Sequence, residues 1–144
     1  MAVFNLHGGA FVAGDADTLD TQSDRLCHDW DAVIISVNYT LAKDGFTIEY
    51  GTAEVADAVK YFLAHAEEYH IDPQKIVLMG YSAGGCHAMM AALSLQEEGI
   101  GLAAQVLCYP FIGDAVSAYA ALPRESRQTL APALFLLAGN DPIS

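Results

Sequence analysis

The sequence predicts an α/β fold, a mostly parallel sheet of about five strands with helices on both faces. Short apolar runs of strand length alternate along the chain with longer stretches of helical periodicity. The runs are apolar throughout, which is typical of strands that are buried on both faces and pair in parallel. Such strands are joined by right-handed crossovers. We therefore expect one core domain over residues 1–144.

The elements follow from the pattern in chain order. The expected strands are residues 2–6, 32–38, 75–80, 103–109 and 133–139. A first helix, with Thr18 as its expected cap, places apolar side chains at Leu19, Leu26, Cys27 and Trp30. A second is marked by Val55, Val59, Phe62, Ala66 and Tyr69, and a third begins near Ser82 and carries Met89, Met90 and Leu93. Pro73 disfavours helix at Asp72, so residues 70–76 are expected to be a turn.

Composition limits the function classes. The 144 residues are 53% apolar, enough for a sizeable core, and carry a formal net charge of -12. This charge argues against nucleic acid and anionic membranes as partners, because both need clustered Lys and Arg. No apolar run approaches the ~20 residues of a membrane span, and no secretory signal opens the chain, so the cytoplasm is the default location. The three cysteines, Cys27, Cys86 and Cys108, are expected to be buried thiols rather than disulfides or metal ligands.

A glycine-flanked serine lies where an expected strand becomes an expected helix. Gly80, Ser82 and Gly84 form the pattern G-x-S-x-G, which in this context indicates a nucleophile elbow. Side chains at Gly80 and Gly84 would clash in such a tight turn, and the helix N-terminus favours developing negative charge. The alternative interpretation is a glycine-rich turn in which Ser82 is only an N-cap.

A second motif ends the first expected strand, at His7-Gly8-Gly9-Ala10. Acyl transfer passes through a tetrahedral oxyanion, which preset backbone N–H groups must meet at hydrogen-bond distance. We expect Gly9 and Ala10 to supply such groups, with Gly8 as an alternative, and Ala83 to supply another from the residue after the nucleophile. His7 is interpreted as a structural histidine that pins this loop.

Together these motifs resemble those of the α/β-hydrolases, and within them the hormone-sensitive-lipase-like and acetyl-esterase-like carboxylesterases. "HGGAF" resembles their HGGGF oxyanion motif, "GYSAGG" their nucleophile elbow, and "ISVNYTLA" the segment that usually reads V-x-Y-R-L-A. "IDPQKIVLMG" and "LCYP" resemble the stretches on either side of the elbow. The resemblance implies Asp141, in "LAGNDPIS", as the acid of a catalytic triad; a simple Asn-Asp-Pro turn is the alternative.

The chain departs from this family at position 40 and at both of its ends. Thr40 stands where the family usually has arginine, which bears on a local supporting contact and not on the chemistry. The triad histidine of the family follows the acid, whereas His7, His28, His65, His70 and His87 all precede Asp141, and none of them is expected to be the base. We interpret the sequence as a hydrolase core shortened at both ends. Residues 32–38 and 133–139 then become unpaired edges, which invite association between copies.

The sequence thus leads to two hypotheses. The first is a serine carboxylesterase that hydrolyses short-chain or acetyl esters through an acyl-enzyme, with no cofactor and no metal. The second is a catalytically impaired or non-catalytic hydrolase fragment that acts in binding or assembly. Nucleotide binding is disfavoured, because neither glycine motif has the lysine of a P-loop or the spacing of a dinucleotide fingerprint.

Overall fold

The structure is a computed structural model that describes residues 1–113 and 130–139. Its elements, in chain order, are β1 (Ala2–Leu6), the short 3-10 helix η1 (Ala16–Leu19), α1 (Asp20–Trp30), β2 (Val33–Val37), α2 (Ile48–Ala64), β3 (Ile76–Tyr81), α3 (Ala83–Glu97), β4 (Ala104–Cys108) and β5 (Ala133–Leu136). The predicted α/β fold is confirmed, since all five strands pair in parallel in one sheet.

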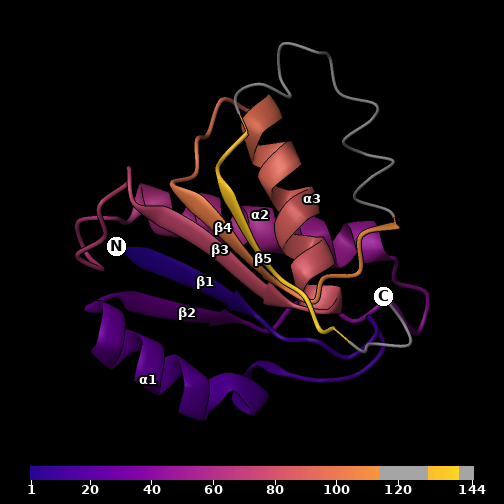
Figure 1. The fold of residues 1–144 in the computed structure, drawn as a ribbon. Coiled ribbons are helices and arrows are strands. Elements are labelled where there is room, and N and C mark those ends of the chain that lie inside the picture. Colours follow the sequence, from indigo (N-terminus) through magenta and orange to yellow (C-terminus); the bar gives the residue numbers. More distant parts are fainter. Residues whose placement is uncertain (114–129, 140–144) are drawn as a thin grey trace.

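The sheet order is β2-β1-β3-β4-β5, so the chain reverses direction across the sheet at β1. The crossover from β1 to β2 runs one way and the crossover from β2 to β3 runs back. Right-handed connections therefore place α1 on one face and α2 and α3 on the other (Figure 1). The loops after β1 and β3 meet at this switch point, where α/β sheets bind their ligands.

The register brings the carboxyl ends of the strands to one edge of the sheet. Leu6 is level with Val37 on one side and with Gly80 on the other, and Tyr81 is level with Cys108. The chain segments that leave β1, β3 and β4 therefore emerge side by side. This is the arrangement that the two glycine motifs require if they are to act together.

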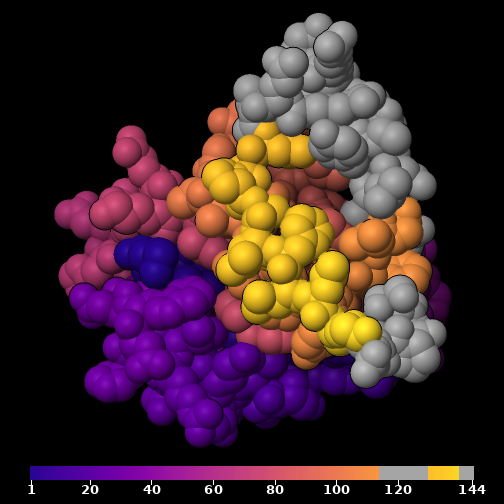
Figure 2. Space-filling view, viewed as in Figure 1, coloured from indigo at the N-terminus to yellow at the C-terminus, as the bar shows by residue number. Residues whose placement is uncertain are grey.

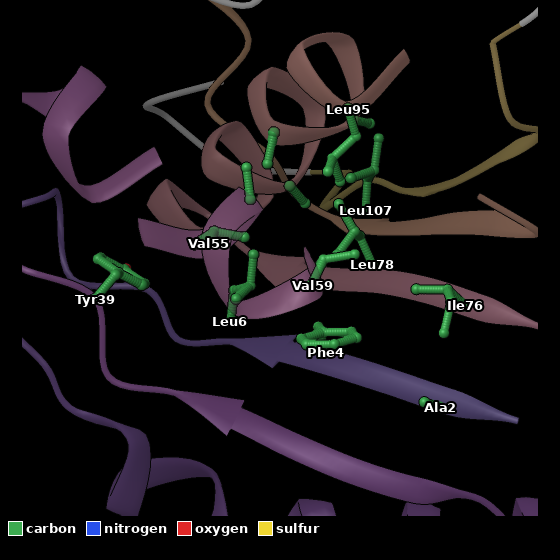
Figure 3. Packing of buried hydrophobic residues seen from close by; sticks show 14 of the residues in the cluster. Ala2, Phe4, Leu6, Tyr39, Val55, Val59, Ile76, Leu78, Leu95 and Leu107 are labelled. Atoms are coloured by element: carbon green, nitrogen blue, oxygen red, sulfur yellow. The ribbon is translucent and has the colours of Figure 1, made fainter. Parts of the chain in front are cut away.

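Apolar packing on both faces holds the sheet in place. Alternate residues of β1, Phe4 and Leu6, point toward α2 and α3, where they join Val59 and Leu78 in the larger cluster (Figure 3). A smaller cluster on the α1 face includes Val3. Full burial of each large aliphatic side chain stabilises the fold by about 1.5 to 3 kcal/mol.

Two local expectations were wrong. Thr18 does not cap a helix with its side chain: Asp15 caps η1 by accepting from the Thr18 amide at 3.1 Å, and α1 begins at Asp20. The second helix ends at Ala64 instead of continuing to Tyr69, because the chain turns at residues 65–70 and the Ile71 amide closes back onto Ala66. Ala66 and Tyr69 still pack against the core, which explains the helical pattern.

Burial also corrects the expectation for the cysteines. Cys86 and Cys108 are buried, but Cys27 is exposed on α1. The same helix leaves Trp30 41% exposed and has no buried residue. The apolar stripe of α1 is short and interrupted by acidic residues, so the helix is not buried against the sheet.

Candidate active site

Ser82 lies at the sharp turn between β3 and α3. Its backbone has φ 52° and ψ -114°, a conformation that residues other than glycine rarely adopt. Hydrogen bonds on both sides hold it there, since its amide donates to the Cys108 carbonyl at 3.0 Å and its own carbonyl accepts from the amides of Gly85 and Phe111 at 3.0 and 3.1 Å. The side chain makes no capping hydrogen bond within the described part of the chain, and the residue is half-buried.

The glycines around Ser82 permit this turn. A Cβ at Gly84 would overlap the carbonyl oxygens of Leu6 and His7, where α3 begins against the end of β1. A Cβ at Gly80 would overlap the backbone of Gly84 itself. The serine can therefore occupy a strained bend only because the chain on either side of it approaches neighbouring backbone without side chains.

The loop after β1 lies directly beside this turn. A Cβ at Gly8 would be 3.4 Å from the Cβ of Ser82 and 3.1 Å from the Tyr81 carbonyl oxygen. The loop then folds tightly, because the Val12 and Ala13 amides both donate to the Gly9 carbonyl at 3.1 and 2.9 Å. Gly9 takes φ 131°, which suits only glycine.

Two further residues of this loop have left-handed backbones. Ala10 and Phe11 have φ 52° and 68°. With Ser82 (φ 52°) and Tyr109 (φ 39°), they are the members of the positive-φ set that follow the carboxyl ends of β1, β3 and β4, whereas Asp31, Asp44 and His70 lie elsewhere. Each such residue costs on the order of 1 to 3 kcal/mol and persists only where the surrounding structure holds it. Strained backbone of this kind is concentrated at functional sites.

Backbone donors at this edge are left open. In residues 1–113 and 130–139, the amides of Gly9, Ala10 and Ala83 donate to no protein acceptor. Ala83 is the first residue of α3, so its amide also carries the positive end of the helix dipole. An anionic oxygen placed between the loop and the helix start would therefore be stabilised.

A buried polar cluster lies beneath the loop. His7 Nδ1 donates to the Gly8 carbonyl at 2.8 Å, and the Tyr39 hydroxyl donates to the His7 carbonyl at 2.5 Å. The two rings are stacked, with centroids 4.3 Å apart. Burial raises the pKa of Tyr39, so its hydroxyl stays protonated as a donor. These two hydrogen bonds hold the backbone of His7 and Gly8, where the loop begins.

His87 belongs to the same cluster. Its Nδ1 lies 2.8 Å from the Thr52 hydroxyl, and burial, with a smaller contribution from the nearby His7, lowers its pKa to about 4. The sequence does not reveal this contact, because Thr52 and His87 lie on different helices. Tyr39 could have been found from the sequence, since it lies in the segment "ISVNYTLA", which resembles a segment of the family.

The structure also shows what replaces the arginine that the resemblance led us to expect at position 40. The Thr40 amide and hydroxyl donate to the two carboxylate oxygens of Glu54 at 2.6 and 3.0 Å. The segment after β2 is thus hydrogen-bonded to α2 through the Glu54 carboxylate. The next residues reach the glycine loop, where the Ala42 amide donates to the Phe11 carbonyl at 2.6 Å.

The structure brings seven of the eight predicted site residues to one edge of the sheet. They are Gly8, Gly9, Ala10, Gly80, Ser82, Ala83 and Gly84. Asp141, the predicted acid, lies outside the described residues. No helix within residues 1–113 and 130–139 is both long and apolar enough to cross a membrane.

Fold and site together define the class. The sequence model of a family described as "alpha/beta hydrolase fold" matches residues 3–138, and the chain belongs to this family. Among its relatives, an arylesterase of Saccharolobus solfataricus is 32% identical over 110 residues, and an ethyl acetate hydrolase of Pseudomonas putida is 33% identical over 111 residues. Each of these alignments covers 76% of this chain.

Solved structures agree with this assignment. An esterase of Pyrobaculum calidifontis superposes with a TM-score of 0.83 at 26% identity, over 99% of this chain and 58% of the other. The chain spans about a third of the length of the curated relatives, with 36% of the arylesterase and 35% of the ethyl acetate hydrolase aligned.

Proposed function

We propose that the protein is a serine carboxylesterase that hydrolyses its substrate through an acyl-enzyme, with Ser82 as the nucleophile. The single observation that carries this proposal is the strained turn at Ser82 beside open backbone amides. The esterases among the relatives support the same reaction class.

The chemistry follows from this arrangement. The Ser82 oxygen attacks the ester carbonyl carbon, its proton passes to a general base, and the carbonyl oxygen becomes an oxyanion. The C–O bond to the alcohol then breaks, and the alcohol leaves with that proton. Water attacks the acyl group on Ser82 by the same route and releases the acid.

The open amides supply the electrostatic part. We assign the oxyanion to the amides of Gly9, Ala10 and Ala83, with Gly8 as an alternative donor. Removing one donor of this kind typically costs about 3 to 4 kcal/mol in the transition state. No metal or cofactor is needed for this reaction.

The proton-transfer partners complete the proposal. Asp141 is proposed as the acid that orients the base. His7 and His87 are poor candidates for the base, because the Nδ1 atoms of both rings are hydrogen-bonded and both residues are 1% exposed. We assign the role of the base to none of the five histidines, at positions 7, 28, 65, 70 and 87.

Substrate size is proposed from the relatives. The ethyl acetate hydrolase acts, by its name, on an acetyl ester with a short alcohol. We accordingly propose short-chain or acetyl esters in the cytoplasm as the substrates of this protein.

A fluorophosphonate probe tests the proposal. Even without a complete triad, oxyanion binding can retain a rate advantage of ~10³ to 10⁴. We expect an adduct at Ser82, located by peptide mass spectrometry and absent in Ser82→Ala, while the other serines of the chain serve as internal controls. Modification of Ser82 no faster than that of the other serines would reject the proposal.

That negative result would favour the second candidate, a hydrolase-fold protein acting in binding or assembly. The observation in its favour is the open edge of β5, where Leu134, Phe135 and Leu136 are 56%, 48% and 48% exposed.

A further inference from the structure

His87 is an unusual group for its position. It lies in α3, five residues after Ser82, and is 1% exposed, in contact with the rings of Tyr39 and Phe11. A buried polar side chain is costly unless it is hydrogen-bonded. Its partner, Thr52, is itself 6% exposed in α2.

The hydrogen-bond pattern fixes the direction of the contact. The Thr52 hydroxyl lies 3.0 Å from the Ile48 carbonyl, which can only accept, so the single hydroxyl proton points there. The same oxygen must therefore accept from His87 at 2.8 Å. This assigns the proton of the neutral ring to Nδ1, and the bond ties α3 to α2.

The ring of His87 also contacts the glycine loop, at residues 8–11. It meets the ring of Phe11 edge-on, with centroids 5.4 Å apart and planes at 81°. It also lies 4.3 Å from the ring of Tyr39, the residue that bonds the His7 carbonyl. Phe11 directly follows Ala10, and both have left-handed backbones that need external support.

We propose that His87 is a positioning residue: its bond to Thr52 and its ring contact with Phe11 hold the loop at residues 8–11 so that the Gly9 and Ala10 amides face the Ser82 hydroxyl. This inference rests on the proposed function for its catalytic consequence. The geometry of the loop can be measured without it.

Two substitutions separate the two contacts. His87→Phe keeps a ring against Phe11 but removes the donor to Thr52, whereas His87→Gln keeps an N–H donor but removes the ring. Thr52→Val keeps the His87 ring and removes its acceptor, together with the hydrogen bond that the Thr52 hydroxyl donates to the Ile48 carbonyl. Val59→Ala is the matched control, because Val59 is fully buried in α2 but lies about 10 Å further along the helix.

The first readout is the amide NMR shifts of Gly9 and Ala10 in each folded variant. We expect both His87 variants and Thr52→Val to move these shifts, while Val59→Ala leaves them unchanged at a comparable loss of thermal stability. Shifts that move no more in the three variants than in Val59→Ala would overturn the inference, since His87 would then only fill the core.

The second readout is the rate of fluorophosphonate labelling at Ser82. We expect it to fall about 10-fold in His87→Phe and His87→Gln, because a misplacement of ~1 Å can cost up to 10²-fold in rate, and to stay within about 2-fold in Val59→Ala. An unchanged rate in both His87 variants would overturn the inference. If wild-type Ser82 is not labelled, the proposed function fails, and the NMR shifts alone decide the role of His87.

Discussion

At the scale of single residues, the candidate site depends on close backbone approaches. The turn at Ser82 is held by hydrogen bonds to both of its main-chain groups and is possible only because Gly80 and Gly84 lack side chains. The strain at Ser82, Ala10 and Phe11 is concentrated at one end of the sheet. Elsewhere in the described part, glycines such as Gly101 have open space around them.

Gly84→Ala should therefore be severe. Its Cβ would overlap two carbonyl oxygens of the β1 end, and overpacking of this kind costs about 1 to 3 kcal/mol, or more where backbone must move. Gly101→Ala, with nothing within 4 Å, is the control and should change the free energy of unfolding by less than about 0.5 kcal/mol. Urea denaturation measures both, and equal effects would contradict the tight turn.

His87 gives stability a dependence on pH. Burial lowers its pKa in the folded state to about 4 from an ordinary 6.5, so the unfolded chain binds the extra proton between these values. Stability should fall as the pH is lowered through that window, by about 3 kcal/mol in all. His87→Gln does not titrate there, so its stability should fall less by that amount when urea unfolding is followed from pH 7 to pH 4. Parallel pH profiles would show that the imidazole is not buried in its neutral form.

At the scale of elements, much of the site could be predicted from the sequence. The strands appeared as apolar runs, and the turn at Ser82 and the loop after β1 appeared as glycine motifs at the ends of those runs. These features are local, so neighbouring residues reveal them. The start of α1 and the end of α2 could not be predicted. Each is set by the hydrogen bonds of a local turn, and such a turn does not change the spacing of apolar residues in the sequence.

Contacts between distant elements were also missed. Thr52 and His87 are 35 positions apart, and Thr40 and Glu54 are 14 apart, so no spacing rule joins them. Such pairs become visible only once α2 is packed on the sheet. Both of them support the loops around Ser82.

The Thr40–Glu54 contact can be tested on its own. Glu54→Ala removes the acceptor of two hydrogen bonds, including one to a backbone amide at 2.6 Å, and should cost about 2 kcal/mol. Asp57→Ala on the same helix breaks only an exposed bridge to Lys60 and should cost less than about 0.5 kcal/mol. Thermal or urea unfolding compares them, and a similar loss in both would mean that Thr40 is not anchored.

At the scale of the whole molecule, the sheet is unevenly covered. Within residues 1–113 and 130–139, β2 and β5 end the strand order, as the sequence predicted for these two segments. Residues 130–139, in yellow, lie on the outer surface (Figure 2), and Leu137 beside β5 is 73% exposed. Apolar edge strands without charged residues pair readily with other chains, so β5 is the strand at which we expect association.

We expect the 144-residue chain to self-associate through β5. Phe135→Lys places a charge in the middle of this edge and should shift sedimentation profiles toward monomer at a given concentration. Phe46→Lys, at a similarly exposed aromatic residue far along the chain, is the control and should have little effect. A wild-type chain that stays monomeric at all concentrations would refute this expectation.

The central claim is that the Ser82 hydroxyl and the amides of the neighbouring loop act on the same ester carbonyl group: the hydroxyl oxygen attacks its carbon, and the amides bind its oxygen. A crystal structure of the phosphonate adduct tests this most directly. We expect the phosphoryl oxygen within about 3 Å of the amide nitrogens of Ala83 and of Gly9 or Ala10. A phosphoryl oxygen that points away from both the loop and the start of α3 would contradict the claim.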